Sequence, residues 1–253
     1  MAKVFLLAHT PSPEKTVAAA AKLCYSSSDI EGLNDSLTDE KAAAFVEMLS
    51  EIGHESPIEH ASFTFGIEGV SRSLLAQITR HRIASFSVKS QRYVREGSFG
   101  YVTPPEIAAD PEAKRLYDEI MSEDQKKYDQ IAAILKEKHI KTFMAEGKDE
   151  KTATRLAEKK AIEDARFVLP NACETRMVVT MNARELMHFF SLRCCNRAQW
   201  EIRALAWEML KLCQQAAPAL FKNSGPGCIR GGCPEGKMSC GKAEQVRKKR
   251  EAL

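Results

Sequence analysis

An alternation of apolar and smaller or polar residues between Ala61 and Gly69 constrains the fold more than any other feature of the sequence. The apolar members stand at every second position: Ala61, Phe63, Phe65 and Ile67. Because successive side chains of a strand point to opposite faces, the alternation predicts a strand with one buried face. Such a strand needs a sheet to join and other elements to cover it.

The strand leads through a short predicted helix into a basic stretch, Gln77–Tyr93. Ser71 is placed to cap that helix, and Leu74 and Ile78 give it an apolar spacing. The following Ile83–Val88 is rich in β-branched, aromatic and hydroxyl residues, which is typical of a loop or a strand.

No acidic residue occurs in Gln77–Tyr93, and its cations begin where the helix is expected to end: Arg80, His81, Arg82, Lys89 and Arg92. One interpretation is that the helix dipole stabilises cations in the last turn. The other is an anion pocket, in which guanidinium forks match phosphate oxygens and serine hydroxyls add hydrogen bonds. Local chemistry favours the second.

The same patterns predict the other elements. A buried strand is expected at Lys3–Ala8, a polar loop at Asp29–Asp35 and a further strand at Ala172–Met181. Helices are expected over residues 13–23 and from Thr38, as N-cap, to Gly53. Another is expected through Leu186, Phe189, Phe190 and Leu192, which face a core. The last helix is expected from about Ala198 to Ala217 and is ended by Pro218.

Residues 111–165 are predicted to be mostly helical, with an interruption at Gly147. The helical spacing involves Leu116, Ile120, Tyr128, Ile131 and Leu135. We expect this segment to serve packing, including contacts between subunits. It belongs to a single domain over residues 1–221.

A tail of different character, 222–253, is rich in glycine, lysine and cysteine. Cys228, Cys233 and Cys240 could bind zinc together with a fourth ligand, although they lack the paired spacing of common zinc sites. A flexible or partner-covered tail with free thiols is the interpretation that we favour, and we expect no metal site.

Composition narrows the class of protein. With 37 basic and 34 acidic residues among 253, the net charge is only +3, which argues against a dedicated nucleic-acid binder. The first ten residues lack the pattern of a signal peptide, and no apolar run is long enough to span a membrane. We therefore expect a cytoplasmic protein with reduced thiols.

Two histidines with nearby glutamates, in Gly53–His60, suggest a zinc protease at first sight. His54 and His60 are six residues apart, whereas that motif needs histidines at i and i+4 on one helical turn. Pro57 would also disrupt a continuous helix between them. A polar turn with a capping role is the alternative.

Three segments resemble the flavin-dependent thymidylate synthases. The pattern Q-x-x-R-H-R-x7-S-x-R runs from Gln77 to Arg92, A-R-F-V-L-P contains Arg166, and N-A-R-x-L…H-F-F-x-L-R…A-Q-W-E-I-R ends at Arg203. The resemblance covers roughly residues 1–221. It implies an α+β fold with a twisted, mostly antiparallel sheet flanked by helices, and a homotetramer whose active sites are assembled from several chains.

The resemblance also implies ligands and roles. The expected ligands are FAD, dUMP, 5,10-methylenetetrahydrofolate and a reduced nicotinamide, for which we expect NADPH. The implied flavin contacts are His54, Ser56, Glu59, Arg80, His81, Arg82, Val88, Asn182, Arg184 and His188.

The dUMP contacts are Gln77, Arg80, Val88, Ser90, Arg92, Arg166 and Arg193. Arg193 is the expected catalytic residue, because a permanently charged guanidinium can stabilise negative charge on the uracil ring. The position of Val88 is often acidic in the family, so here only its backbone could contact a ligand.

Three alternatives remain open. Ser90 could be a covalent nucleophile, but the sequence shows no dedicated base to activate it. The chain could be a non-catalytic nucleotide or nucleic-acid binder, which predicts salt-sensitive binding to polyanions and no flavin. A zinc-dependent hydrolase built on His54, His60 and the tail cysteines predicts stoichiometric zinc.

Overall fold

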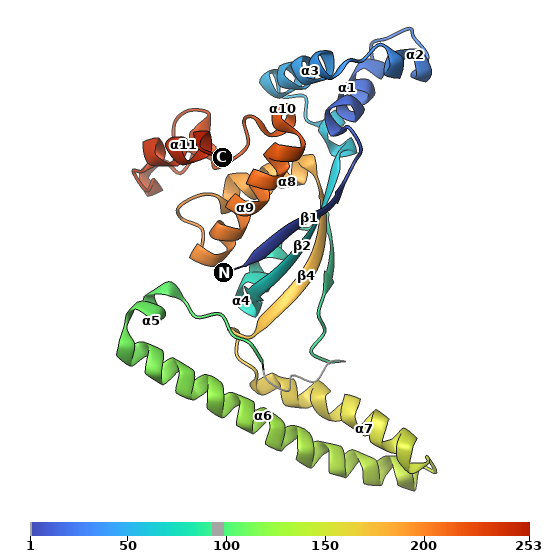
Figure 1. Ribbon diagram of the computed structural model, residues 1–253, viewed down its shortest axis with the longest axis vertical. Coiled ribbons are helices and arrows are strands. Elements are labelled where there is room, and N and C mark those ends of the chain that lie inside the picture. Colours follow the sequence, from blue (N-terminus) through green and yellow to red (C-terminus); the bar gives the residue numbers. More distant parts are fainter. Residues whose placement is uncertain (1, 93–98) are drawn as a thin grey trace. The chain divides into compact units, whose positions relative to one another are not determined.

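The protein has an α+β fold built on a four-stranded antiparallel sheet (Figure 1), as the sequence predicted. The computed structural model describes residues 2–92 and 99–253. The strand order is β1-β2-β4-β3, and the strands are β1 Lys3–His9, β2 Ser62–Ser71, β3 Ala84–Val88 and β4 Glu174–Asn182.

Strand β2 confirms the alternation that predicted it. Phe63, Phe65 and Ile67 are at most 1% exposed, while the intervening residues are partly exposed. At the end of the strand, Ser71 Oγ accepts a hydrogen bond from Leu74 N at 3.0 Å and so caps α4, Arg72–Ile78, as predicted.

The prediction that Lys3–Ala8 is a buried strand was half right. It is a strand, β1, but it lies at the edge of the sheet, where β2 is its one antiparallel partner among the described residues. Phe5 is 49% and Leu7 56% exposed, alternating with the less exposed Val4 and Leu6. A continuous apolar run predicts burial on both faces. Within the described part of the chain, only one face of this strand is covered.

Contacts divide the chain into two compact units. The first comprises Met1–Glu68, Ala76–Ser87 and Met177–Leu253, and the second comprises Gly69–Leu75 and Val88–Arg176. The helices of the first unit are α1 Pro13–Leu23, α2 Ile30–Asp35, α3 Asp39–Ile52, α8 Ala183–Arg193, α9 Trp200–Ala216, α10 Pro218–Phe221 and α11 Ala243–Glu251, with a 3-10 turn, η1, at Ser56–His60.

Helix α3 begins and ends as the sequence predicted. Thr38 Oγ1 accepts from Lys41 N at 3.3 Å, and Gly53 closes the helix in the left-handed region at φ 76°. The polar loop expected at Asp29–Asp35 is instead the short helix α2. Asp29 Oδ1 accepts from Gly32 N at 2.8 Å, and Leu33 is buried. A local cap and one buried leucine are enough to fold this polar segment.

Aromatic side chains form the centre of the first unit. Phe63 of β2 meets Phe221 of α10 edge to face at 5.2 Å, and Phe190 of α8 meets Phe221 at 6.1 Å. Phe189 and Phe190 are fully buried, but Leu192, also expected to face the core, is 47% exposed. The buried stripe of α8 continues at Arg193, seven residues after Leu186, rather than at Leu192.

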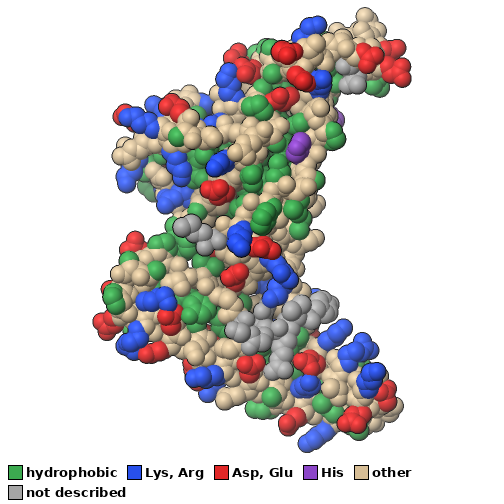
Figure 2. Space-filling view, in the orientation of Figure 1, with side chains coloured by type: hydrophobic (Ala, Val, Ile, Leu, Met, Phe, Trp, Pro, Cys, Tyr) green, Lys and Arg blue, Asp and Glu red, His purple; other side chains and the backbone are tan. Residues whose placement is uncertain are grey.

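The second unit is dominated by a helical hairpin, α6 Pro111–Ala145 and α7 Glu150–Ala165, preceded by α5 Pro105–Ala109 (Figure 1). Asp110 caps α6, and Gly147 adopts φ 85° in the turn between α6 and α7, which confirms the predicted interruption. Tyr128, Ala132 and Ile162 pack between the helices. The face of the hairpin seen in Figure 2 mixes both signs of charge, as expected for solvated helices.

Two residues of the predicted apolar spacing in this hairpin are exposed. Leu116 is 46% and Ile120 56% exposed, whereas Tyr128 is fully buried. Helix α6 packs against α7, α5 and the segment around Phe99 and Tyr101, and helical spacing alone did not distinguish these buried positions from Leu116 and Ile120.

The helix expected to be the last is not. Helix α9 ends before Pro218, as predicted, but α10, two 3-10 turns at Gly227–Ile229 and Gly236–Met238, and α11 follow it. Val246 of α11 is 5% and Arg250 9% exposed, so this end of the tail is packed onto the first unit. Within residues 2–92 and 99–253, no helix combines the length and apolarity needed to cross a membrane.

Candidate functional site

Helix α8 delivers Arg193 to a partly buried cluster with His81 and Glu185. Leu186, Phe189 and Phe190 face the core of the first unit, and Arg193 continues the same stripe one turn later. Arg193 Nε donates to His81 Nε2 at 3.3 Å, and His81 Nδ1 lies 3.1 Å from Glu185 Oε1.

These two contacts define the protonation state of His81. Since Nε2 accepts from an arginine, the ring proton sits on Nδ1 and is donated to the carboxylate of Glu185. Burial lowers the pKa of His81, while the hydrogen bond that the ring donates to Glu185 opposes that shift. A neutral imidazole therefore accepts from Arg193 at neutral pH.

The electrostatics of Arg193 are shaped by the same burial. Burial lowers its pKa, and the charge of Arg80 adds to that effect. An arginine still remains protonated at neutral pH. The cluster thus presents a fixed positive charge in partly desolvated surroundings, where charge acts more strongly than in water.

The turn after α4 gives the three consecutive residues Arg80, His81 and Arg82 different exposures to solvent. Arg80 N donates to Gln77 O and His81 N to Ile78 O, at 3.4 and 3.1 Å. The chain then enters β3. This turn buries the His81 side chain and leaves Arg80 and Arg82 exposed.

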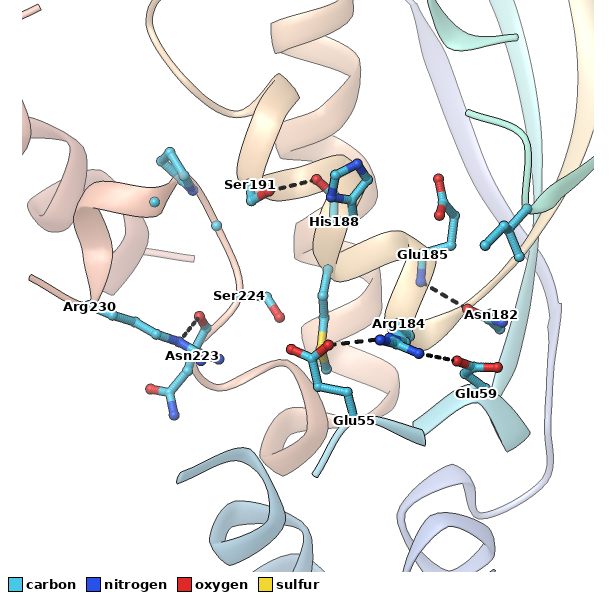
Figure 3. Close-up of a pocket in the computed structure, with 15 residues that line it drawn as sticks. Glu55, Glu59, Asn182, Arg184, Glu185, His188, Ser191, Asn223, Ser224 and Arg230 are labelled. Carbon is cyan, nitrogen blue, oxygen red and sulfur yellow. Dashed lines mark hydrogen bonds and ion pairs between the residues drawn. The ribbon is translucent and has the colours of Figure 1, made fainter. Parts of the chain in front are cut away.

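A cavity of about 580 Å³ lies beside α8 in the first unit (Figure 3). Arg184 bridges two carboxylates at its edge, with Nε 3.2 Å from Glu55 Oε2 and Nη1 2.5 Å from Glu59 Oε1. The hydrogen bond with Glu59 is the main cause that raises the pKa of Arg184. Four of the predicted flavin residues line this cavity: Glu59, Asn182, Arg184 and His188.

Asn182 is fixed at the start of α8. Its Oδ1 accepts from Glu185 N at 2.8 Å and caps the helix. Because the cap uses the oxygen, the group that Asn182 can offer to a ligand is the amide donor Nδ2.

Two other predicted flavin residues, His54 and Ser56, line a second cavity of about 800 Å³. Its walls are largely apolar and include Phe45, Met48 and Leu49 of α3. The predicted flavin contacts of the first unit are therefore divided among two cavities and the Arg80–Arg82 turn.

The predicted phosphate contacts of the second unit gather around Glu163. Arg92 Nη1 lies 3.4 Å from Glu163 Oε1, and Arg166 Nε donates to Glu163 O at 3.2 Å. Ser90 Oγ accepts from Arg92 N at 3.2 Å. Two arginines distant in sequence thus meet near one residue, whose carboxyl pKa is lowered mainly by Lys160. Tyr93, the last residue of the basic stretch, lies outside the described residues.

Sequence reasoning missed Glu185, Ser224 and Arg230. Glu185 stands three residues after the cap Asn182, the capping-box position, and that pattern could have drawn attention to it. Ser224 and Arg230 line the first cavity from the tail, and no local pattern indicates this. Among residues 2–92 and 99–253, no three His, Cys, Asp or Glu side chains gather as a metal site.

Comparison with known proteins identifies close relatives. The family model described as "Thymidylate synthase complementing protein" matches residues 5–219. A flavin-dependent thymidylate synthase of Clostridium tetani is 57% identical over 246 residues, covering 97% of this chain and 96% of that protein. Those of Geobacter sulfurreducens and Nitratidesulfovibrio vulgaris are each 47% identical, covering 97% and 95% of this chain and 97% and 94% of those proteins.

Proposed function

Because the chain belongs to the family of flavin-dependent thymidylate synthases, we propose that it methylates dUMP reductively to dTMP. In this proposal 5,10-methylenetetrahydrofolate donates the one-carbon unit, and NADPH supplies the reducing equivalents through FAD. Bound flavin would supply the redox chemistry, while the protein supplies binding, orientation and electrostatics.

The observation that carries the proposal is the contact between Arg193 and His81. A neutral imidazole, itself held by Glu185, fixes one edge of the guanidinium. Among the described residues the other donors of Arg193 have no hydrogen-bond partner, and we propose that they face a ring carbonyl or N3 of the uracil. Negative charge that develops there during reaction would be stabilised by a charge already in place.

The cavity beside α8 fits a flavin on the chemistry of its donors. Its volume, about 580 Å³, lies within the range of small-molecule sites. Asn182 offers an amide donor, Arg184 a guanidinium and His188 an exposed imidazole. Arg184 would exchange part of its pairing with Glu55 and Glu59 for contact with the cofactor. We assign His54, Ser56, Arg80 and Arg82 to the same ligand on the resemblance alone.

For the phosphate of dUMP we propose Arg92, Arg166 and Ser90. A phosphate carries nearly two negative charges and accepts several hydrogen bonds. The convergence of Arg92 and Arg166 near Glu163 supports this assignment. Gln77 and the backbone of Val88 complete the proposed nucleotide contacts.

We also propose that the protein acts as a homotetramer. The apolar side chains of Phe5 and Leu7 on β1, and of Leu116 and Ile120 on α6, are exposed in the single chain. Contacts between copies would remove this surface from water.

The test is a visible absorption spectrum of the purified protein after addition of FAD and removal of the excess, followed by titration with dUMP. We expect a retained flavin band that shifts with dUMP, and formation of dTMP when NADPH and the folate are added. Absence of retained flavin, with or without dUMP, together with salt-sensitive binding to polyanions, would instead support the non-catalytic binder.

A further inference from the structure

The cavity beside α8 has a wall that the family match does not include. Matched residues end at 219, yet the lining continues with Asn223, Ser224, Gly225, Pro226, Gly227 and Arg230. We refer to residues 223–230 as the tail loop. It faces Arg184 and His188 across the cavity (Figure 3), so a ligand there would contact both sides.

Ser224 brings a buried hydroxyl to this wall. The residue is only 4% exposed, and its Oγ has no hydrogen-bond partner among the described residues. In Figure 3 the hydroxyl points away from the tail loop, toward the side where Glu55 and Arg184 lie. Because an unsatisfied buried hydroxyl is costly, a polar ligand in the cavity would remove a penalty that the free protein carries.

Arg230 brings a positive charge to the tail loop. Its Nε donates to Asn223 O at 3.0 Å and its Nη2 to Ser50 Oγ at 3.3 Å. Within the described part of the chain it forms no ion pair with a carboxylate.

The acidic residues of the lining are already engaged. Glu55 and Glu59 pair with Arg184, and Glu185 with His81. Arg230 is thus the cation of the lining that remains available to an anionic ligand.

Helix α11 holds the tail loop in place. Arg250 donates from Nε to Ser224 O at 2.7 Å and from Nη2 to the carbonyls of Phe221 and Lys222 at 2.8 and 2.7 Å. Arg247 donates to the carbonyls of Cys228 and Gly231, at 3.0 and 2.6 Å. Charged donors aimed at one stretch of backbone fix its path.

The loop is also sterically defined at Gly225. This residue adopts φ 143°, a backbone conformation that residues with a Cβ rarely adopt, so this bend of the loop requires glycine. The tail loop therefore has a fixed backbone path, and its residues form one side of the cavity.

We propose that the tail loop is part of the flavin site, where Ser224 hydrogen-bonds to bound FAD and Arg230 pairs with its diphosphate. The inference rests on the proposed function, which assigns this cavity to the flavin. It adds residues from outside the matched family region to the site and gives the C-terminal tail a role in cofactor binding.

The experiment measures FAD and riboflavin affinity of the full-length protein by flavin fluorescence. Arg230→Gln should weaken FAD binding about tenfold and riboflavin binding by less than about twofold, since riboflavin has no phosphate. Ser224→Ala should weaken binding of FAD about fivefold. Matched controls on the same tail, Lys237→Gln and Ser239→Ala, are exposed and should stay within about twofold.

A second measurement does not depend on variants. Amide hydrogen exchange of the tail loop should slow when FAD is added to the unmodified protein. Unchanged exchange, or variants that bind FAD as the controls do, would overturn the inference while the proposed function stands. An unmodified protein that retains no FAD would overturn both. Equal weakening of FAD and riboflavin by Arg230→Gln would exclude pairing with the diphosphate.

Discussion

Helix α8 carries two arginines in opposite electrostatic settings. Arg184, in the first turn, is exposed and bridges Glu55 and Glu59. Arg193, the last residue, is partly buried, contacts the neutral ring of His81 and lies near the charge of Arg80.

The comparison shows how one residue type serves two purposes. Two carboxylates satisfy the charge of Arg184, and solvent screens the interaction, so Arg184 can exchange partners at little cost. The charge of Arg193 is oriented but not neutralised by its hydrogen-bond partner. An oriented, uncompensated charge in partly desolvated surroundings is what stabilisation of a developing anion requires.

The largest effect is expected for Arg193→Lys, which keeps the charge but removes the guanidinium fork that His81 orients. We expect kcat/KM for dTMP formation to fall at least about 100-fold, by analogy with loss of a positioned donor to a developing anion. FAD binding should change little. Arg184→Lys is the matched control on the same helix, and an equal loss in both variants would contradict the distinction between the two arginines.

Glu185→Gln tests whether the carboxylate acts through His81. The neutral amide would polarise the imidazole less, and Nε2 would become a weaker acceptor for Arg193. We expect kcat to fall about tenfold and the free energy of unfolding to fall by about 1–3 kcal/mol, as for disruption of a buried hydrogen bond. Because Glu185 raises the pKa of His81, its removal should also move the acid limb of the pH–rate profile to lower pH.

A structural role alone would lower stability without moving that limb. Glu208→Gln, on the exposed side of α9, is the control for the loss of one carboxylate. If the acid limb of the pH–rate profile stays in place in Glu185→Gln, Glu185 does not act on catalysis through His81.

The protonation of His81 should make both stability and the rate of dTMP formation depend moderately on pH. His81 has its pKa lowered below the ordinary 6.5, chiefly by burial, and it faces Glu185, Arg193 and His188. Its contribution to stability is present above pH 6.5, where folded and unfolded states are both neutral, and is lost as the pH falls toward the folded pKa. Protonation also occupies Nε2 and removes the acceptor for Arg193.

We therefore expect an acid limb in kcat with a midpoint below 6.5, absent in His81→Asn. The measurement is the rate of dTMP formation from pH 5 to 8, with urea denaturation at the same pH values. A midpoint above 6.5 would contradict a buried, neutral His81.

The smallest effect is expected for Arg184→Gln. Its two ion pairs are exposed, so the midpoint of urea unfolding should hardly change. FAD affinity should fall only about threefold. In the unmodified protein, Arg184 must give up part of its pairing with Glu55 and Glu59 when it contacts the cofactor, so its net contribution to binding is small. A marked loss of stability would show that these pairs are structural.

Local features were predictable because they depend on neighbouring residues. The alternation in β2, the cap at Thr38 and the left-handed Gly53 follow from periodicity and backbone stereochemistry within a few residues. The same reasoning failed where burial was the question. Exposed Leu7 and Leu192 carry the right side chain for a core but lie where no element of the described chain covers them.

The candidate site shows the same division. Motif resemblance indicated Arg193, His81 and Arg184, but not that His81 turns inward while Arg80 stays outside. It also gave no reason to place Ser224 in the cavity. That requires knowing that Arg250 of α11 donates to Ser224 O.

The sequence by itself determined the longer helices up to Ala216, most strand positions, the caps at Thr38 and Ser71, and membership of a family with a recognisable arginine motif. Only the tertiary structure decided which side chains meet. His81 and Glu185 are 104 residues apart, and Arg193 is 112 residues from His81. Local periodicity reaches a few residues along the chain, whereas contacts at such separations exist only after the sheet and α8 have packed together.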